Sequence, residues 1–217
     1  MKGLIAVQGG AATSAARLLL VHNSPEPIAD TVDIYLELTD GTELAKIEDV
    51  PYRAAAAYTS PAIDENNATD VAVKIADNSS TNSANPAFAD TVSITGGTSY
   101  VGVVNGVADP TQGTGLTADA ALTLDASEIV GNDPAAGEVG VIVHHGSADA
   151  PPVSVFNDAD SSELVPFADY GDITNIINAS ADTITLRLDN ANDSSTIDFY
   201  SAPLSGFDED TVVVFAS

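Results

Sequence analysis

Two histidines are the first residues in this chain whose type and spacing could support chemistry. His22 is followed by Ser24, and His144 is followed by Ser147, so either pair, with a nearby aspartate, has the residue types of a serine hydrolase. The same surroundings occur twice, however, and catalytic machinery rarely survives equally in both copies of a structural repeat. We therefore interpret each imidazole as a cap at a strand end that hydrogen-bonds a carbonyl of the following proline-containing turn. The sequence contains no GxSxG, HExxH or phosphate-binding glycine loop, and we predict that the protein is not an enzyme.

Two acidic segments concentrate the oxygen ligands that calcium prefers, NDADSSE from Asn157 and DNANDSS from Asp189. Neither segment fits an EF-hand loop, because the first lacks the glycine at the sixth position, and acidic turns are common in any very acidic chain. A zinc site at the adjacent histidines is disfavoured, since neighbouring strand residues point to opposite faces. We predict no cofactor and keep calcium as an alternative. Its candidate ligands are Asp158, Asp160, Asp189 and Asp193.

Composition excludes several classes of function. The 217 residues include 32 acidic and 6 basic side chains, for a formal charge of −26, and such a field repels nucleic acid and anionic membrane surfaces. No stretch approaches the ~20 apolar residues of a membrane span, so we predict neither nucleic-acid binding nor membrane insertion. The absence of cysteine excludes disulfides and cysteine nucleophiles. Many aspartates and very few lysines favour an extracellular, cell-surface location.

The elements that would position these residues come in two similar copies. VHNSPEPIADTVDIYL, from Val21, reappears in shorter form as VHHGSADAPPVSVF, from Val143, which makes His22 and His144 equivalent. A period of roughly 115 residues is too long for a solenoid unit and suits two tandem domains. The other matches are VPYRAAAAY (Val50) with VPFADYGDI (Val165), VAVKIAD (Val71) with ITLRLDN (Ile184), and ITGGTSYVGVVNG (Ile94) with LSGFDEDTVVVFAS (Leu204).

Short runs rich in Val, Ile, Thr and Tyr, separated by Gly, Pro, Asn, Asp and Ser, predict a chain that is nearly all strand. About seven short strands per ~100 residues favour a β-sandwich. We predict two tandem immunoglobulin-like β-sandwich domains with a detached N-terminal strand. The predicted boundaries are 1–16 for the N-terminal strand and a flexible tether, 17–131 for the first domain and 132–217 for the second.

The run V-H-x-S-P followed by V-D-I-Y, then V-P-Y-x-x-x-x-Y and a glycine-rich turn before an apolar strand, resembles the family catalogued as domain of unknown function 4397. The pattern covers most of the chain from Arg17 onward and is degraded in the second half, where Phe167 replaces the tyrosine. The resemblance implies immunoglobulin-like domains, often in tandem, on secreted or envelope proteins of bacteria and archaea. The family has no assigned activity, so the resemblance implies a fold and a location rather than a chemistry.

The two copies differ at their ends. After VVNG the first copy continues into another apolar segment, AALTLDASEIV from Ala120, whereas the second copy has no counterpart after VVVFAS. A β-prone segment, GLIAVQ from Gly3, precedes the first copy and belongs to neither. One spare strand and one vacant strand position predict strand donation. The predicted donor residues are Leu4, Ile5, Ala6 and Val7; the predicted acceptor strand is Thr211–Phe215 or Val139–Val143, with Val141, Val143, Val212 and Val214 lining the groove.

Donation between copies would be heterologous and would build an open head-to-tail filament. We predict an extracellular structural protein that assembles with other copies of itself in this way. GLIAVQ could instead be a remnant of an export signal, an extra strand of the first domain, or a strand folded back onto its own second domain, and the second domain could be complete with fewer strands. The alternative function is a monomeric adhesive or glycan-binding envelope module. Sparse aromatics argue against glycan binding, because the chain has no Trp and only 6 Tyr and 6 Phe.

Overall fold

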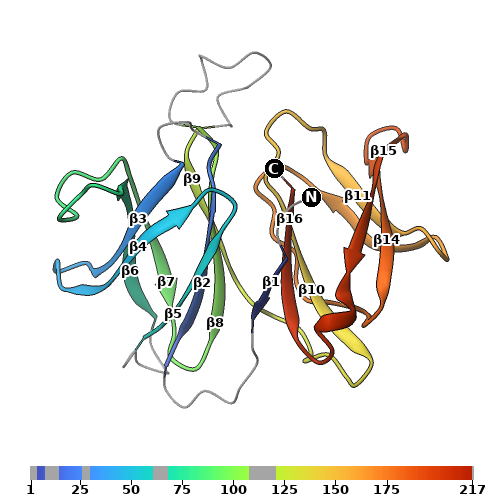
Figure 1. Cartoon of the computed structure of the whole chain (residues 1–217), viewed down its shortest axis with the longest axis horizontal. Helices are drawn as coiled ribbons and strands as arrows, with labels where there is room; N and C mark the ends of the chain where they lie inside the picture. The colour runs from blue at the N-terminus through green and yellow to red at the C-terminus, as the bar shows by residue number, and fades with distance from the viewer. Residues whose placement is uncertain (1–3, 8–14, 26–29, 61–67, 108–120, 217) are drawn as a thin grey trace. The chain divides into compact units, whose positions relative to one another are not determined.

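The computed structural model describes residues 4–7, 15–25, 30–60, 68–107 and 121–216. The regular secondary structure of the described residues is nearly all β-strand, which confirms the predicted all-β class (Figure 1). The chain divides into two compact units, Gly10–Ile129, and Val130–Ser217 together with Met1–Gly9. Each unit is a sandwich of two four-stranded sheets, and the immunoglobulin-like subtype stays a prediction. The described part of the chain contains no helix that is long and apolar enough to cross a membrane.

The first unit contains the strands from β2 to β9. Its first strand, β2, pairs in parallel with its next-to-last strand, β8, at the centre of one sheet, and the other strand pairs are antiparallel. That sheet has the order β5 (Ala55–Thr59), β2 (Arg17–Asn23), β8 (Ser99–Asn105) and β9 (Thr123–Glu128). The second sheet has the order β4 (Glu43–Pro51), β3 (Thr31–Leu38), β6 (Thr69–Asp77) and β7 (Phe88–Ile94).

The second unit repeats this arrangement and draws one strand from the other end of the chain. One sheet has the order β1 (Leu4–Val7), β16 (Thr211–Ala216), β10 (Glu138–His145) and β13 (Ile177–Ser180), with β10 and β16 parallel. The other has the order β12 (Ser162–Ala168), β11 (Val153–Asn157), β14 (Thr183–Asn190) and β15 (Thr196–Pro203). A single 3₁₀ turn, Leu204–Gly206, precedes β16 among the described residues.

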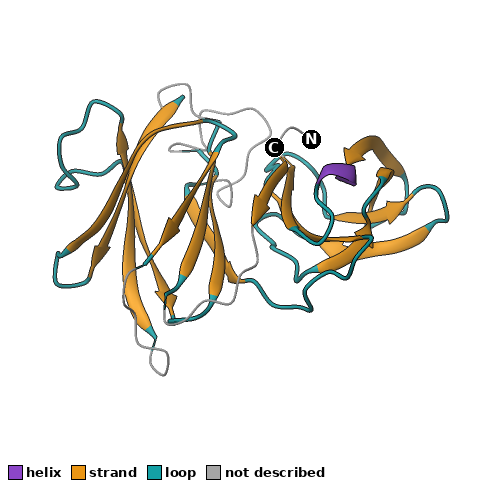
Figure 2. Ribbon diagram, turned by 60° about the horizontal axis from the view of Figure 1, so that its bottom comes forward, coloured by secondary structure: helices purple, strands orange, loops and turns teal. Residues whose placement is uncertain are grey.

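Figure 2 shows the strands and connecting loops of both units. Each pair of sheets encloses its own apolar core. Alternate residues of a strand point to one face, so Leu18 and Leu20 of β2 meet Ile34 and Leu36 of β3 in the first core. In the second core, Val141 and Val143 of β10 meet Val155 of β11 and Leu186 of β14. This period-2 burial is the physical reason why short β-branched runs form these layers rather than helices.

Strand pairing corrects two of the sequence equivalences. His22 exchanges backbone hydrogen bonds with Arg53 and Ala54, and His145, not His144, does the same with Gly171 and Asp172. His22 therefore corresponds to His145. The match based on the letters V and H is wrong by one residue, and a one-residue slip moves every side chain to the other face of the sheet.

The second correction concerns the VPY and VPF motifs. In the first unit, Val50 of β4 pairs with Val32 of β3. Val153 of β11 is the equivalent of Val32, and its partner in β12 is Ala168 rather than Val165. Both strand pairs contain register shifts, so the letters V-P do not determine which residues stand opposite one another. The match of VAVKIAD with ITLRLDN holds, since Tyr35 pairs with Lys74 and Phe156 with Arg187 at the same positions of the two sheets.

Candidate functional site

The strand position beside β16 is the feature that best distinguishes the second unit. β1 pairs antiparallel with β16, with Leu4, Ile5, Ala6 and Val7 opposite Val214, Val213, Val212 and Thr211. The predicted donor segment and the first of the two predicted acceptor strands are thus brought together. In this register Leu4 and Ala6 pair with Val214 and Val212, the two β16 residues that line the core.

The first unit fills the same position from its own sequence. β9 pairs antiparallel with β8 there, with Ala126 opposite Gly102 and Ser127 opposite Val101. Since β8 and β16 each pair in parallel with the first strand of their unit, β1 occupies in the second unit the place that β9 occupies in the first (Figure 1). The AALTLDASEIV segment of the sequence supplies this strand, as predicted.

The acceptor side of this position is apolar and completely buried. Val212 and Val214 are at most 1% exposed, and Val141 and Val143 lie beside them in the same core. β10, the alternative acceptor, lies between β16 and β13 and has a neighbour on each side, so β16 carries the edge. A cavity of about 20 Å³ adjoins the site; it is lined only by apolar residues, among them Val141, Val143 and Val214.

The histidine at the end of β10 is held in a structural role. The Nε2–H of His145 donates to the carbonyl of Pro151 at 3.0 Å, and the backbone N–H of Ser147 approaches Nδ1 at 3.4 Å. Because the carbonyl only accepts and the amide only donates, these contacts suit the neutral imidazole with its proton on Nε2. Burial lowers the pKa of His145, which also favours the neutral form. The predicted cap on a proline-containing turn is present, one residue later than expected.

Neither serine is hydrogen-bonded through its hydroxyl to a histidine ring. The hydroxyl of Ser147 donates to Asp149 at 3.1 Å rather than to an imidazole. His22 contacts the ring of Tyr52 edge-on, with 6.1 Å between centroids, and Ser24 is buried at 2% exposure. His144 lies next to His145 in β10, where consecutive side chains leave on opposite faces. This arrangement differs from a catalytic triad, in which a serine hydroxyl is hydrogen-bonded to a histidine that an acidic residue orients.

The four calcium candidates do not converge. Asp160 accepts from Ser162 and Asp193 accepts from Ser195 within their own turns, and these hydrogen bonds lower the pKa of both carboxyls. Asp189 is 6% exposed and pairs with Nε of Arg187 at 3.1 Å, while Asp158 lies 4.0 Å from the same guanidinium. Over the ranges that the structure describes, no group of three or more His, Asp or Glu could hold a metal ion.

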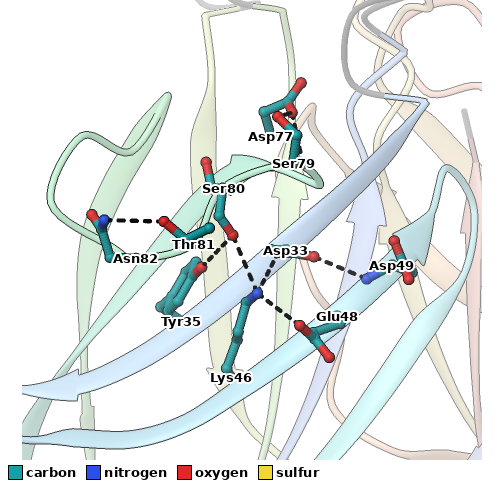
Figure 3. Close-up of polar contacts among 10 residues, drawn as sticks. All are labelled: Asp33, Tyr35, Lys46, Glu48, Asp49, Asp77, Ser79, Ser80, Thr81 and Asn82. Carbon is teal, nitrogen blue, oxygen red and sulfur yellow. Dashed lines mark hydrogen bonds and ion pairs between the residues drawn. The ribbon is translucent and has the colours of Figure 1, made fainter.

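A buried polar cluster in the first unit was not anticipated from sequence (Figure 3). Asp33 is 1% exposed and pairs with Lys46 at 2.9 Å, and Lys46 also binds Glu48 and the carbonyl of Ser80. The Tyr35 hydroxyl donates to the same carbonyl at 3.1 Å. The segment between β6 and β7 thus crosses the outer face of the β3 sheet. The available signal was the alternation of TVDIYLEL, which places Asp33, Tyr35 and Glu37 on the face opposite the core.

Glu37 belongs to the same outer face. Its carboxylate pairs with Lys74, and hydrogen bonds from Lys74 and then Ser83 lower the pKa of Glu37. Two of the six basic residues of the chain, Lys46 and Lys74, thus neutralise the two buried carboxylates of this face. The cluster is a structural solution for buried charge, since each buried acid has a cation within hydrogen-bond reach.

Comparison with known proteins adds little to this geometry. No family model and no curated protein matches the chain. Among solved structures it is similar to the TIE protein of Bacillus anthracis, with 8% identity and a TM-score of 0.28. The match covers 93% of this chain but 33% of the other, so the chain spans about a third of that protein's length. A score this low supports no inference about function.

Proposed function

We propose that this protein is an extracellular structural subunit that assembles head to tail, with the N-terminal strand of one copy bound beside β16 of the next. The observation that carries the proposal is the pairing of Leu4–Val7 with β16 at the position that β9 fills beside β8. A strand supplied from a distant part of the chain can also be supplied by another chain, because the same backbone hydrogen bonds form in both cases. The acidic composition and the resemblance to domain of unknown function 4397 support the extracellular location.

Concentration decides which copy supplies the strand. The segment GGAATSAA, from Gly9, joins β1 to β2 in sequence, and two sites joined by a short chain segment meet at an effective concentration on the order of 1 mM. Closed monomers therefore dominate well below this concentration, and head-to-tail chains form as the protein approaches it. Crowding of subunits at a cell surface would supply such a concentration. Each copy offers one donor and one acceptor, so the filament is polar.

A cysteine pair reports which copy supplies the strand. Ile5 stands opposite Val213, and directly opposed residues have Cβ atoms about 4.5–5.5 Å apart, close enough for a disulfide after small adjustments. The sequence contains no cysteine, so Ile5→Cys with Val213→Cys introduces the only thiols. After oxidation, non-reducing electrophoresis separates cross-linked monomers from covalent multimers.

We expect cross-linked monomers at about 10 µM and a ladder of multimers as the protein approaches about 1 mM. The matched control is Ile5→Cys with Val101→Cys, because Val101 holds the equivalent place in β8 and stands opposite Ser127 of β9. This control should give neither product. Cross-linked monomers alone at about 1 mM would overturn assembly, and no cross-link at any concentration would overturn the strand site itself.

A further inference from the structure

The outer face of the sheet β12-β11-β14-β15 carries a row of aromatic and cationic side chains. Phe156, Arg187 and Phe199 stand directly opposite one another on β11, β14 and β15, and we call them the Phe–Arg row. The guanidinium of Arg187 lies 4.6 Å from the centroid of the Phe156 ring. Phe199 is 51% exposed, and Ile197 in the same strand is 44% exposed. Large apolar side chains gathered at this level of exposure mark an interaction surface.

The first unit has residues at the same positions as the Phe–Arg row, but the connection between β6 and β7 covers them. Tyr35, Lys74 and Ala89 occupy the equivalent positions, and Tyr35 is only 1% exposed. The ten-residue connection 78–87 between β6 and β7 lies over it, and the carbonyl of Ser80 accepts the hydrogen bond of the Tyr35 hydroxyl (Figure 3). In the second unit the equivalent connection, between β14 and β15, is 191–195. The shorter connection leaves the Phe–Arg row open.

The cover of the first unit shows which chemistry this face accepts. Its sequence, NSSTNSANPA, is uncharged and rich in hydroxyl and amide groups. The hydroxyl of Ser83 binds the carboxylate of Glu37, and the carbonyl of Ser80 accepts from Lys46 at 3.2 Å. Asp158, which is hydrogen-bonded to Thr185 of β14 through its backbone, occupies the place of Glu37 and is 42% exposed at its side chain.

A ligand over the open row meets three kinds of group. The ring of Phe199 offers a flat apolar surface, the carboxylate of Asp158 accepts hydrogen bonds from hydroxyls, and the guanidinium of Arg187 donates hydrogen bonds to oxygens. Glu163 stands opposite Phe156, where the first unit has Lys46 opposite Tyr35, so this face is more acidic than its counterpart. With a formal charge of −26, the protein would repel any anionic polymer.

We propose that the Phe–Arg row binds a neutral glycan. Aromatic residues are sparse in the sequence, but the structure leaves the ring of Phe199 exposed opposite Arg187. Sugar rings combine the two required properties: apolar faces that pack on an exposed phenyl ring, and hydroxyl groups that hydrogen-bond Asp158 and Arg187. No charge on the ligand opposes the field of the protein. The site is independent of the strand position beside β16, and a monomeric protein would bind as well as a filament.

Native gel electrophoresis in polyacrylamide that contains a soluble polysaccharide tests this site. The probes are a β-glucan, a mannan and a galactan, all neutral, with alginate as the anionic comparison. The variant Phe199→Ala removes the exposed ring without disturbing the core, and Val130→Ala, at a site that is 49% exposed outside the row, is the matched control. Circular dichroism confirms that both variants fold.

We expect at least one neutral probe to retard the protein, Phe199→Ala to weaken that affinity roughly tenfold, and Val130→Ala to leave it unchanged. Alginate should cause no retardation. The proposal is overturned by the absence of retardation with all three neutral probes, or by equal retardation of Phe199→Ala. Retardation by alginate that Phe199→Ala abolishes would equally overturn it, because the ligand class would then be wrong.

Discussion

Deleting residues 1–10 should open the edge of β16 and leave the second unit folded but less stable. Four antiparallel residue pairs make about four backbone hydrogen bonds, each contributing about 1 kcal/mol net, and this roughly offsets the ~1 kcal/mol of backbone entropy that each ordered residue loses. The remaining stabilisation comes from the apolar composition of the segment, and burial of one or two such residues contributes about 2–3 kcal/mol. We expect the free energy of unfolding of the second unit to fall by that amount.

The same estimate sets the affinity of a free peptide. A stabilisation of 2–3 kcal/mol corresponds to a roughly 30- to 150-fold preference for the bound strand, and division of an effective concentration of about 1 mM by this preference gives a Kd on the order of 10 µM. A synthetic peptide of residues 1–9 added to the truncated protein should therefore restore the β16 edge in trans.

Hydrogen exchange measures this edge directly, because β16 amides that lose their partner on deletion exchange faster and regain protection with peptide. We expect half of the lost protection to return near 10 µM peptide. A peptide with aspartate in place of Leu4 and Ala6 is the control, since these two positions pair with Val214 and Val212, which line the core. If about 1 mM of the native peptide restores no protection, or if the aspartate peptide binds equally well, the strand-site reasoning is refuted.

Three further predictions concern the charged and titratable groups. Lys74→Met should lower the free energy of unfolding by about 1.5–3 kcal/mol at neutral pH, because Glu37 loses its cation. Lys74 holds the pKa of Glu37 below its usual value, so the stability that this ion pair contributes is present above about pH 4.5 and is lost as the pH falls through the lowered pKa. In urea denaturation, the stability difference between the variant and the natural protein should therefore vanish at low pH. A difference that stays the same at low pH would contradict the ion pair. Burial lowers the pKa of His145, so its contribution to stability should be constant above about pH 6.5 and should fall as the pH drops below that value. His145→Gln should remove this dependence of the melting temperature on pH. If the variant keeps the same dependence, another group causes it. Millimolar calcium should leave the melting temperature unchanged, because Asp160 and Asp193 are engaged in their own turns and Asp189 is paired with Arg187; a rise that chelator reverses would show a site.

Much of the fold could be predicted from the sequence because its signals are local. The alternation of VAVKIAD and ITLRLDN places Lys74 and Arg187 on the outer faces of their sheets. In the structure these two residues hold equivalent positions, with Lys74 opposite Tyr35 and Arg187 opposite Phe156. The segment after VVNG was expected to be a strand of the first domain, and β9 is that strand. Period-2 burial and turn residues determine such features within a few positions of the chain.

The details that sequence could not supply depend on pairing between distant residues. The letters V-H matched His22 with His144, but strand pairing matches it with His145, because which face of a strand is buried depends on its neighbours in the sheet. Likewise, nothing in the Tyr35 and Phe156 segments alone predicts that one ring is 1% exposed and the other lies in an open row. That difference arises from the lengths of the β6–β7 and β14–β15 connections.

By itself, the sequence determined that the protein is a duplicated, acidic β-sandwich chain with one apolar segment outside both copies, because composition, alternation and repetition are properties of the chain alone. Only the tertiary structure decided where that segment belongs. A four-residue apolar strand has no preference of its own for any edge, and the vacant place beside β16, opposite Val212 and Val214, selects its partner.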